Sequence, residues 1–371
     1  MVTFDLAVVG AGIIGLAHAL AAAKRGLRVV VIDRDMQANG ASIRNFGLVV
    51  VSGQDPGISL QRAQRTREVW LDVAPQAGIG VVQQGMLVAA QRPEALVLLE
   101  SFHQTEQGQQ CRLLSAQEVG CHQPQLDASR IAGGLHSPFE LRVESREAIP
   151  KLAAFLAEKH SVEFRRGVSV LSLAPPSVET SHGTIKADKV VVCPGDDFAT
   201  LYPDRIDRYG VRRCKLQMLR LANPGFSLRS TLISDLSLIR YEGYAQLPEA
   251  SRLQARLKSE CPRALENGVH LIVAQGADGS LVVGDSHHYG QTLDPFGSAE
   301  VDDLILDELA TLLGKAPAVE ARWTGTYATA SETPAFIDAP EHNVRLVMIT
   351  SGTGASTGFA IGEETIAGLF G

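Results

Sequence analysis

The chain has 371 residues, of which 45% are hydrophobic and 20% are charged, as is typical of a folded globular protein. At this length, two lobes are expected rather than one simple core. The formal net charge of -7 argues against nucleic-acid binding through a general excess of positive charge. A local group of basic residues could still bind an anionic substrate inside a cleft.

The chain contains five cysteines: Cys111, Cys121, Cys193, Cys214 and Cys261. They form no CxxC pair and have no histidine at metal-ligand spacing, so we expect reduced thiols and no metal site. The first residues lead directly into the apolar run Leu6–Val9, without the basic segment and cleavage site of a secretory signal. That run is far shorter than the ~20 residues of a membrane span. We therefore expect a cytoplasmic protein that does not bind membranes.

The first elements in chain order form a βαβ unit. A buried strand is predicted over residues 5–9, an Ala-rich helix over Ile13–Arg25, and a second buried strand over Leu27–Ile32, with Gly26 ending the helix. A strand, a glycine-rich loop, a helix and a strand within about thirty residues indicate the start of a parallel sheet.

The next elements are helices over 56–75 and 93–107 with a β-rich segment (80–89) between them, a helix over 146–160, and strands over 162–164, 168–173 and 184–193. Residues 211–323 have a different texture, in which short strands alternate with Gly, Pro and Asp turns and with helices over 248–259 and 299–313. This pattern favours a mostly antiparallel sheet. The chain then returns through a strand (345–350) and a Gly/Ser/Thr loop to a last helix (359–369).

These elements predict an α/β fold with two interleaved domains. A Rossmann-type domain with a parallel sheet, which would bind the cofactor, is expected from residues 1–78, 140–210 and 326–371. An α+β substrate domain with a mostly antiparallel sheet is expected from residues 79–139 and 211–325.

The motif Gly10-Ala11-Gly12-Ile13-Ile14-Gly15 joins the first strand to the first helix. In such a motif the first glycine permits a tight turn, the second lets the backbone approach a pyrophosphate, and the third lets helix and strand pack closely. The pyrophosphate lies at the helix N-terminus, where free N–H groups and the helix dipole attract an anion. Asp33 ends the second strand, where a carboxylate accepts hydrogen bonds from ribose hydroxyls. The sequence therefore predicts a bound dinucleotide.

Further motifs along the whole chain resemble those of the D-amino acid oxidase, glycine oxidase and sarcosine oxidase superfamily of flavoenzymes. They are the small-residue loop Gly40–Gly47, the mid-chain valine Val168, the turn Cys193-Pro194-Gly195, and the loop Ser351–Gly358 that opens the last helix. The resemblance implies FAD as the cofactor. Sarcosine oxidases attach the flavin to a cysteine in the C-terminal lobe, and no cysteine follows Cys261 here, so the FAD is expected to be noncovalent.

In the superfamily, the N-terminus of the last helix points at the flavin, where it stabilises the negative charge of the reduced ring. The residues implied to contact FAD are Gly10, Gly12, Ile14, Gly15, Asp33, Arg34, Ser42, Asn45, Phe46, Gly47, Val168, Cys193, Gly195, Gly352, Gly354, Ser356 and Thr357.

Two segments, Ser42–Gly47 and Val283–Gly290, resemble the branch of this superfamily that is associated with phosphonate catabolism. The resemblance implies oxidation of 2-aminoethylphosphonate or its N-methyl derivative to phosphonoacetaldehyde and an amine. Hydride transfer to flavin N5 would precede hydrolysis of the imine, with dioxygen or another acceptor reoxidising the flavin. Positioning and an uncharged amine matter most in such chemistry, so no catalytic residue is assigned.

One stretch departs from glycine and D-amino acid oxidases, in which an arginine clamps the substrate carboxylate. The matching stretch Trp323–Ala328 has Tyr327 at that position, so a carboxylate would lack its usual partner. Arginine, histidine and hydroxyl groups elsewhere could hold a phosphonate. The candidates for the substrate site are Arg44, Arg213, Lys215, Arg240, Tyr241, His287, His288 and Tyr327.

Each candidate also has a simpler interpretation. Arg44 could serve the cofactor, Arg213 and Arg240 could lie on the surface, and the two histidines could form a solvated turn. Two alternative functions stay open as well. One is a glycine- or sarcosine-like amino acid oxidase or a 2-hydroxy acid oxidoreductase, and the other is a noncatalytic flavoprotein subunit. No heptad pattern predicts an oligomeric state.

Overall fold

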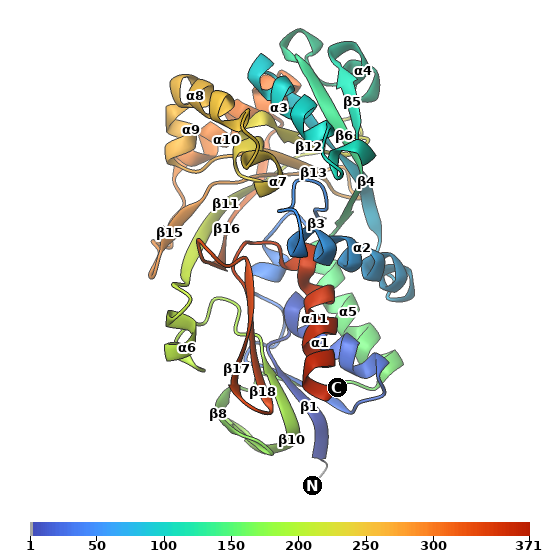
Figure 1. Cartoon of the computed structure of the whole chain (residues 1–371), viewed down its shortest axis with the longest axis vertical. Coiled ribbons are helices and arrows are strands. Elements are labelled where there is room, and N and C mark those ends of the chain that lie inside the picture. The colour runs from blue at the N-terminus through green and yellow to red at the C-terminus, as the bar shows by residue number, and fades with distance from the viewer. Residues whose placement is uncertain (1–2) are drawn as a thin grey trace.

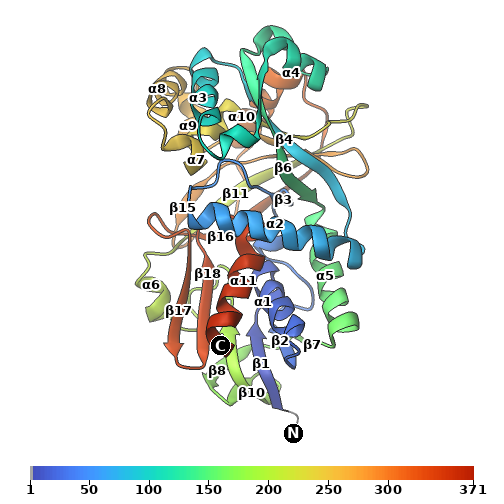
Figure 2. The same cartoon turned by 45° about the vertical axis from the view of Figure 1, so that its right-hand side comes forward.

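The computed structural model describes residues 3–371, which form two lobes arranged along one long axis (Figures 1 and 2). The lower lobe in Figure 1 contains β1 and the C-terminal helix α11, and the upper lobe contains helices such as α3 (Pro93–His103) and α10 (Ala299–Leu313). Each lobe is built around one sheet, and the chain passes between the lobes several times.

The sheet of the lower lobe has the strand order β17-β18-β10-β1-β2-β7, and β9 and β8 extend it from β10. The bounds of its strands are β1 Thr3–Val9, β2 Val29–Asp33, β7 Glu163–Arg166, β8 Val170–Ala174, β9 Ser177–Thr180, β10 Gly183–Val192, β17 Ala335–Glu341 and β18 Val344–Ile349. The pairings from β18 through β10, β1 and β2 to β7 are parallel. Apolar runs such as Val29–Ile32, at most 2% exposed, suit strands that are covered on both faces.

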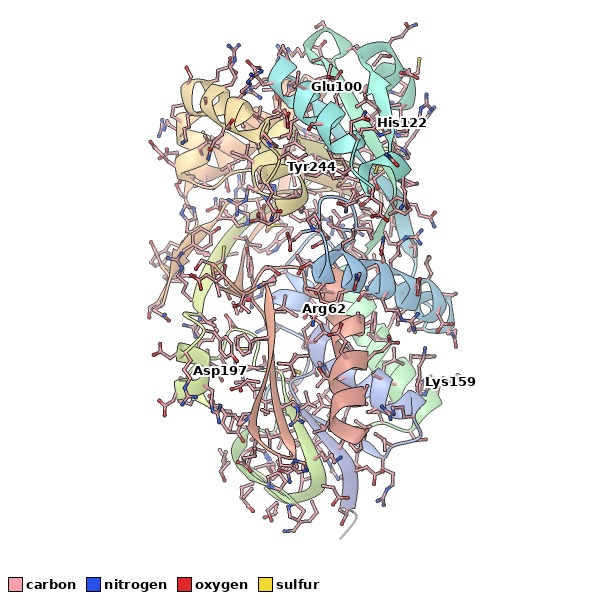
Figure 3. All side chains as sticks on the ribbon, viewed as in Figure 1. Arg62, Glu100, His122, Lys159, Asp197 and Tyr244 are labelled. Atoms are coloured by element: carbon pink, nitrogen blue, oxygen red, sulfur yellow. The ribbon has the colours of Figure 1, made fainter. Side chains whose placement is uncertain are left out.

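Four helices accompany this sheet: α1 Ile13–Lys24, α2 Ile58–Gln76, α5 Ser145–His160 and α11 Gly354–Phe370. A Cβ at Gly362 of α11 would lie 2.9 Å from the backbone of Ala17, so small residues let α11 lie directly against α1. Helix α2 crosses above α11 (Figure 2), where Arg62, labelled in Figure 3, pairs with Glu364 at 2.6 Å. The N-termini of α1 and α11 also lie close together, since a Cβ at Gly354 would lie 3.4 Å from the side chain of Ile13.

The sheet of the upper lobe has the order β15-β11-β14-β13-β12-β4-β6-β3, with β16 on β11 and β5 on β6. The bounds of its strands are β3 Leu48–Val49, β4 Val81–Ala90, β5 Arg112–Ser115, β6 Gly133–Val143, β11 Arg212–Leu221, β12 Thr231–Ser234, β13 Ile272–Gln275, β14 Leu281–Gly284, β15 His288–Gly290 and β16 Val319–Thr329. The pairing of β12 with β4 is parallel, and the other pairings of this sheet in the described chain are antiparallel.

The remaining helices are α3 Pro93–His103, α4 Ala116–His122, α6 Pro203–Asp207, α7 Glu242–Ala245, α8 Ala250–Glu260, α9 Pro262–Glu266 and α10 Ala299–Leu313. Short 3₁₀ turns are η1 Ala41–Ile43, η2 Gly108–Gln110, η3 Ala128–Arg130 and η4 Asp235–Ile239. Tyr244, labelled in Figure 3, is fully buried in the upper lobe, where its ring packs 4.4 Å from that of Phe102.

The predicted α/β class, with a parallel sheet interleaved with a mostly antiparallel one, is confirmed. The expected boundary at 139/140 falls inside β6 and that at 325/326 falls inside β16, because both strands run from one lobe toward the other. Helix α11 starts at Gly354, earlier than the predicted Phe359, and β17 was not predicted. Within residues 3–371, none of the helices has the length and apolar character needed to cross a bilayer.

Candidate active site

The glycine-rich loop between β1 and α1 has the geometry that a bound pyrophosphate requires. Gly10 has a φ of +102°, and a Cβ there would lie 2.4 Å from the carbonyl oxygen of Cys193. A Cβ at Gly15 would lie 1.8 Å from the carbonyl oxygen of Gly10, so α1 can start this close to β1 only with glycine. The N–H of Ile13 donates to the Ser42 hydroxyl at 2.9 Å. The first turn of α1 lines a cavity and can present its N–H groups to an anion.

Asp33 closes this loop from the end of β2. Its Oδ2 accepts a hydrogen bond from the N–H of Ala11 at 2.5 Å, and its Oδ1 accepts one from Asp35 at 2.8 Å. A carboxylate oxygen has further lone pairs, so the side chain is held in place and can still accept from ribose hydroxyls. The neighbouring Arg34 pairs with Asp197 at 2.7 Å and so ties β2 to the loop after β10.

The loop that contains η1 is fixed by its own polar groups. Asn45 Oδ1 accepts from the N–H of Gly47 at 2.7 Å and from the Ser145 hydroxyl at 3.0 Å. Gly47 has a φ of +70°, and a Cβ there would lie 1.8 Å from the carbonyl oxygen of Val143. Phe46, between Asn45 and Gly47 in the chain, is buried and lines the cavity. The loop is therefore a rigid wall of the site.

The start of α11 forms another wall of the cavity. Ser356 accepts a hydrogen bond from the N–H of Val50 at 2.9 Å, and Thr357 donates to the carbonyl oxygen of Thr353 at 3.0 Å. Gly352, with a φ of +73°, lies against Tyr327, whose ring would be 3.2 Å from an added Cβ. Gly352, Gly354 and Ser356 line the same cavity as the start of α1. Two helix N-termini thus converge on one cavity, as a dinucleotide and a reduced flavin both favour.

This cavity has a volume of about 720 Å³ and lies where the two lobes meet. Its lower part is lined by Gly12–Gly15, by Ser42, Asn45, Phe46 and Gly47 of the η1 loop, by Cys193 and Gly195, and by Gly352, Gly354 and Ser356, whereas Gly10, Asp33, Arg34 and Thr357 support these residues from outside the lining. Burial raises the pKa of the Cys193 thiol, so the thiol stays protonated. The glycine cradle, which Asp33 braces through the N–H of Ala11, and the two helix N-termini fit an FAD molecule, which these residues would hold.

The upper part of the cavity contains a cationic group among phenols. Arg240, Tyr241, Tyr289 and Tyr327 line it, and Arg240 donates to the Tyr289 hydroxyl at 3.1 Å. Burial raises the pKa of the Tyr241 and Tyr327 phenols, so both keep a proton to donate. Among residues 3–371, Asp285 is near enough to influence Arg240 electrostatically, but no carboxylate forms an ion pair with it. The guanidinium is therefore available to an anion.

Two histidines and an aspartate complete this part of the cavity. His270, Asp285 and His287 are each at most 8% exposed, and their nearest ligand-type atoms all lie within 4.8 Å of one another. His270 Nε2 lies 2.9 Å from Asp285 Oδ1, and His287 Nε2 lies 3.9 Å from Oδ2. Burial lowers the pKa of His287 to about 3, so its ring is neutral at physiological pH.

Several predicted residues lie elsewhere. Arg213 donates to the carbonyl oxygens of Asp196 and Gln291, and Lys215 donates to those of Asp294 and Phe296. His288 pairs with Lys215 across β15 and β11. Side chains alternate along a strand, so Leu216 lines the cavity while Arg213 and Lys215 are on the other face.

Val168, expected at the adenine, is a core residue, and its N–H donates to the carbonyl oxygen of Asp33. Arg44 borders the cavity but donates to Asn39. The sequence interpretation missed His270 and Asp285. Neither was among the predicted candidates. The pairing of β13 with β14 brings them together, and the N–H of each donates to the carbonyl oxygen of the other.

Comparison with known proteins agrees with this geometry. The family model described as DAO, FAD dependent oxidoreductase, matches residues 5–367. A curated relative, glycine oxidase from Geobacillus kaustophilus (strain HTA426), is 25% identical over 205 residues, which cover 52% of this chain and 54% of that protein. The alignment thus spans about half the length of the curated relative.

Solved structures share the fold. Glycine oxidase from Geobacillus kaustophilus superposes with a TM-score of 0.78 and 20% identity, over 100% of this chain and 95% of that chain. L-proline dehydrogenase from P. horikoshii gives 0.78 and 19%, over 98% and 92%. FAD-bound L-alpha-glycerophosphate oxidase from Mycoplasma pneumoniae gives 0.75 and 17%, over 100% and 95%. With the family model spanning nearly the whole chain and a cradle that fits the cofactor, the protein belongs to the DAO family of FAD-dependent oxidoreductases.

Proposed function

We propose that this protein oxidises the C–N bond of a small amine that carries an anionic group, with 2-aminoethylphosphonate or its N-methyl derivative as the substrate. The observation that carries the proposal is Arg240, a cavity-lining guanidinium without an ion-pair partner in residues 3–371. A charge-assisted hydrogen bond from such a group to an anion is about twice as strong as a neutral one. Family membership supports the redox part of the proposal.

The surroundings of Arg240 support a phosphonate over a carboxylate. Tyr241, Tyr289 and Tyr327 bring three hydroxyls to the same cavity. A phosphonate has three oxygens that accept hydrogen bonds in different directions, whereas a carboxylate has two that lie in one plane. Tyr327 also stands where glycine and D-amino acid oxidases are expected to have an arginine.

The chain would act mainly by binding and orienting the substrate. Arg240 and the phenols hold the anion, and the rigid walls formed by the η1 loop and the start of α11 limit the positions that the amine can take. FAD supplies the acceptor for the hydride that leaves the amine-bearing carbon. The resulting imine is hydrolysed by water to phosphonoacetaldehyde and ammonia or methylamine. When dioxygen is the final acceptor, it is reduced to hydrogen peroxide.

The identity to glycine oxidase favours a second candidate, an oxidase of glycine or sarcosine. Arg240 would hold the substrate carboxylate in that case. One experiment separates the candidates. The purified protein is mixed anaerobically with 2-aminoethylphosphonate, its N-methyl derivative, glycine or sarcosine, and the visible absorbance of the oxidised flavin is followed.

Loss of the flavin band with the phosphonates and not with the carboxylates is the expected result. Loss with glycine or sarcosine alone would establish the second candidate and remove the phosphonate proposal. A flavin that none of these amines or a panel of other small amines and 2-hydroxy acids reduces would point to a noncatalytic flavoprotein.

A further inference from the structure

Beside the anion site, the cavity presents a pair of hydrogen-bond acceptors that an anion cannot use. They are Nε2 of His287 and Oδ2 of Asp285, which lie 3.9 Å apart. Both residues are more than nine-tenths buried and line the cavity. A buried carboxylate and a buried imidazole next to an arginine provide sites of both signs, and therefore match a substrate with a cationic and an anionic end.

The tautomer of His287 follows from its other nitrogen. Nδ1 lies 2.9 Å from the carbonyl oxygen of Gly268. A carbonyl oxygen only accepts, so Nδ1 carries the proton and Nε2 of the neutral ring carries a lone pair. The ring is thus an unprotonated acceptor in the cavity, and its orientation is set from behind by the backbone.

Asp285 is equally constrained. His270 Nε2 lies 2.9 Å from Oδ1 of this carboxylate. His270 itself is held by Ser237, whose hydroxyl lies 3.0 Å from Nδ1. The carboxylate is therefore positioned by its neighbours and keeps capacity to stabilise a positive charge.

We propose that His287 is the base that removes a proton from the substrate ammonium, and that Asp285 stabilises the imidazolium formed. The proposal rests on the proposed function, because an aliphatic amine enters as its ammonium form at neutral pH. The N–H bond of the ammonium breaks and its electron pair stays on nitrogen. The proton moves to Nε2 of His287, and the amine becomes neutral as C–N oxidation requires. A buried carboxylate also stabilises a histidinium in Ser-His-Asp triads, where it faces the other ring nitrogen.

The charged and titratable groups around His287 agree with this role. Asp285 raises the pKa of His287, whereas Arg240 and His270 lower it, and Tyr289 packs 6.4 Å from its ring. Tyr241 lies behind them with its ring 6.1 Å from that of His270. A substrate anion on Arg240 offsets the charge of the guanidinium and so makes His287 a stronger base. Binding of the anion and deprotonation of the amine are coupled by this arrangement.

The same three side chains also have the types and spacing of metal ligands, two histidines and a carboxylate. The positive charge of Arg240 disfavours a metal ion here. A chelator can test this alternative directly, since a base needs no metal.

The test is the pH dependence of flavin reduction by 2-aminoethylphosphonate, measured by anaerobic rapid mixing from pH 6.5 to 10.5. His287→Gln keeps an N–H donor but removes the base. We expect it to be about 100-fold slower than wild type at pH 7, within the usual range for loss of a general base. Its rate should rise with pH and approach the wild-type rate near pH 10, because aliphatic amines lose their proton in solution at about pH 10.4. Asp285→Asn should also shift the profile to higher pH, since it weakens the base.

His288→Gln is the matched control, because this neighbouring histidine is only partly buried and does not line the cavity. It should keep the wild-type profile. If His287→Gln slows the reaction by the same factor at every pH, His287 has a merely structural role and the proposal is wrong. Loss of wild-type activity with a chelator would overturn it in favour of a metal site.

If the proposed function is wrong, the experiment gives a different result. Wild-type flavin would not be reduced by the phosphonates at any pH. The same pH series would then be run with the amine that does reduce the flavin, and parallel wild-type and His287→Gln profiles would again refute the base.

Discussion

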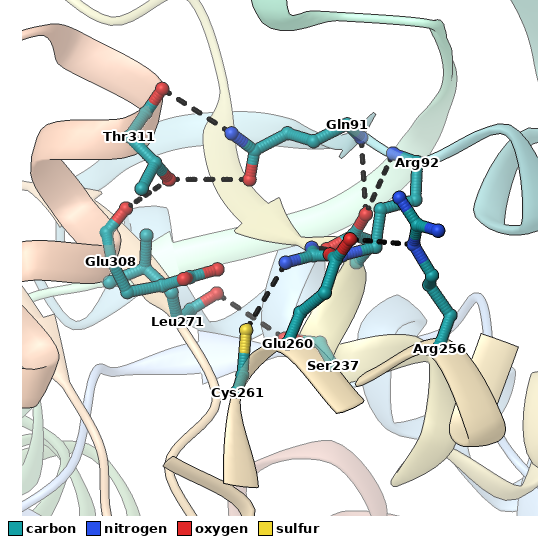
Figure 4. A network of polar contacts seen from close by, with 10 residues as sticks. Gln91, Arg92, Ser237, Arg256, Glu260, Cys261, Leu271, Glu308 and Thr311 are labelled. Atoms are coloured by element: carbon teal, nitrogen blue, oxygen red, sulfur yellow. Dashed lines mark hydrogen bonds and ion pairs between the residues drawn. The ribbon is translucent and has the colours of Figure 1, made fainter. Parts of the chain in front are cut away.

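Glu308 of α10 is a buried carboxyl group that should make the stability of the protein depend on pH. Its exposed fraction is 8%, and its Oε1 has no hydrogen-bond partner within residues 3–371. Burial and the nearby Asp235 carboxylate raise its pKa to about 7. Figure 4 shows Glu308 beside the polar network around Arg92. Arg92 pairs with Asp235 at 2.7 Å. Because Arg92 is already paired with Asp235, Glu308 has no cation of its own among the described residues and is the carboxyl group here that is most easily protonated.

The direction of this pH dependence follows from the number of protons that Glu308 binds in the folded and unfolded states. In the unfolded chain, Glu308 titrates near its ordinary value of 4.5. Between pH 4.5 and 7 the folded protein holds a proton that the unfolded chain has lost. The free energy of unfolding therefore has its full contribution from Glu308 below pH 4.5 and loses it as the pH rises through 7. A shift of about 2.5 pKa units corresponds to about 3 kcal/mol.

Glu308→Gln has a similar shape and no ionisation, so it should remove this dependence. Relative to wild type, the variant should gain up to about 3 kcal/mol between pH 5 and pH 8. The measurement is urea unfolding at several pH values with FAD at one saturating concentration. The difference between the two proteins cancels the titration of all other groups.

Asp307→Asn is the control, because Asp307 is on the exposed side of the same helix. Its difference from wild type should be the same at every pH. If the difference between Glu308→Gln and wild type is also independent of pH, Glu308 does not titrate in this window and the reasoning is refuted.

Three other changes have expected outcomes. Gly15→Ala should abolish FAD binding, measured as flavin absorbance per chain, because the added Cβ would lie 1.8 Å from the Gly10 carbonyl oxygen. In the control Gly368→Ala, the added Cβ has no neighbour within 4 Å, so this variant should retain FAD. Arg240→Met should weaken binding of the phosphonate amine by about 10- to 100-fold in a flavin spectral titration and leave FAD content unchanged; unaltered affinity would exclude Arg240 as the anion site. Burial lowers the pKa of His18 to about 4, so its contribution to the free energy of unfolding is lost as the pH falls from 6.5 to 4. In His18→Gln, the free energy of unfolding should therefore depend less on pH over that range.

The sequence alone determined the glycine-rich turn from which the cofactor half of the site is built. The motif Gly10–Gly15 and the acidic end of β2 were predicted in the positions where the structure has them. This succeeds because the requirement is local. A positive φ at Gly10 and the close approach of Gly15 to its carbonyl oxygen involve residues only a few positions apart, and few other sequences satisfy them.

The substrate half depended on the tertiary structure. Whether Arg213 and Lys215 or Leu216 faces the cavity is decided by the register of β11, since a shift of one residue reverses every side chain. Asp285 and His270 meet through the pairing of adjacent strands, and Arg240 reaches the same cavity from a 3₁₀ turn far away in sequence. No local pattern encodes such a meeting, because the groups that bind a substrate are selected by their distance in space and not by their spacing along the chain.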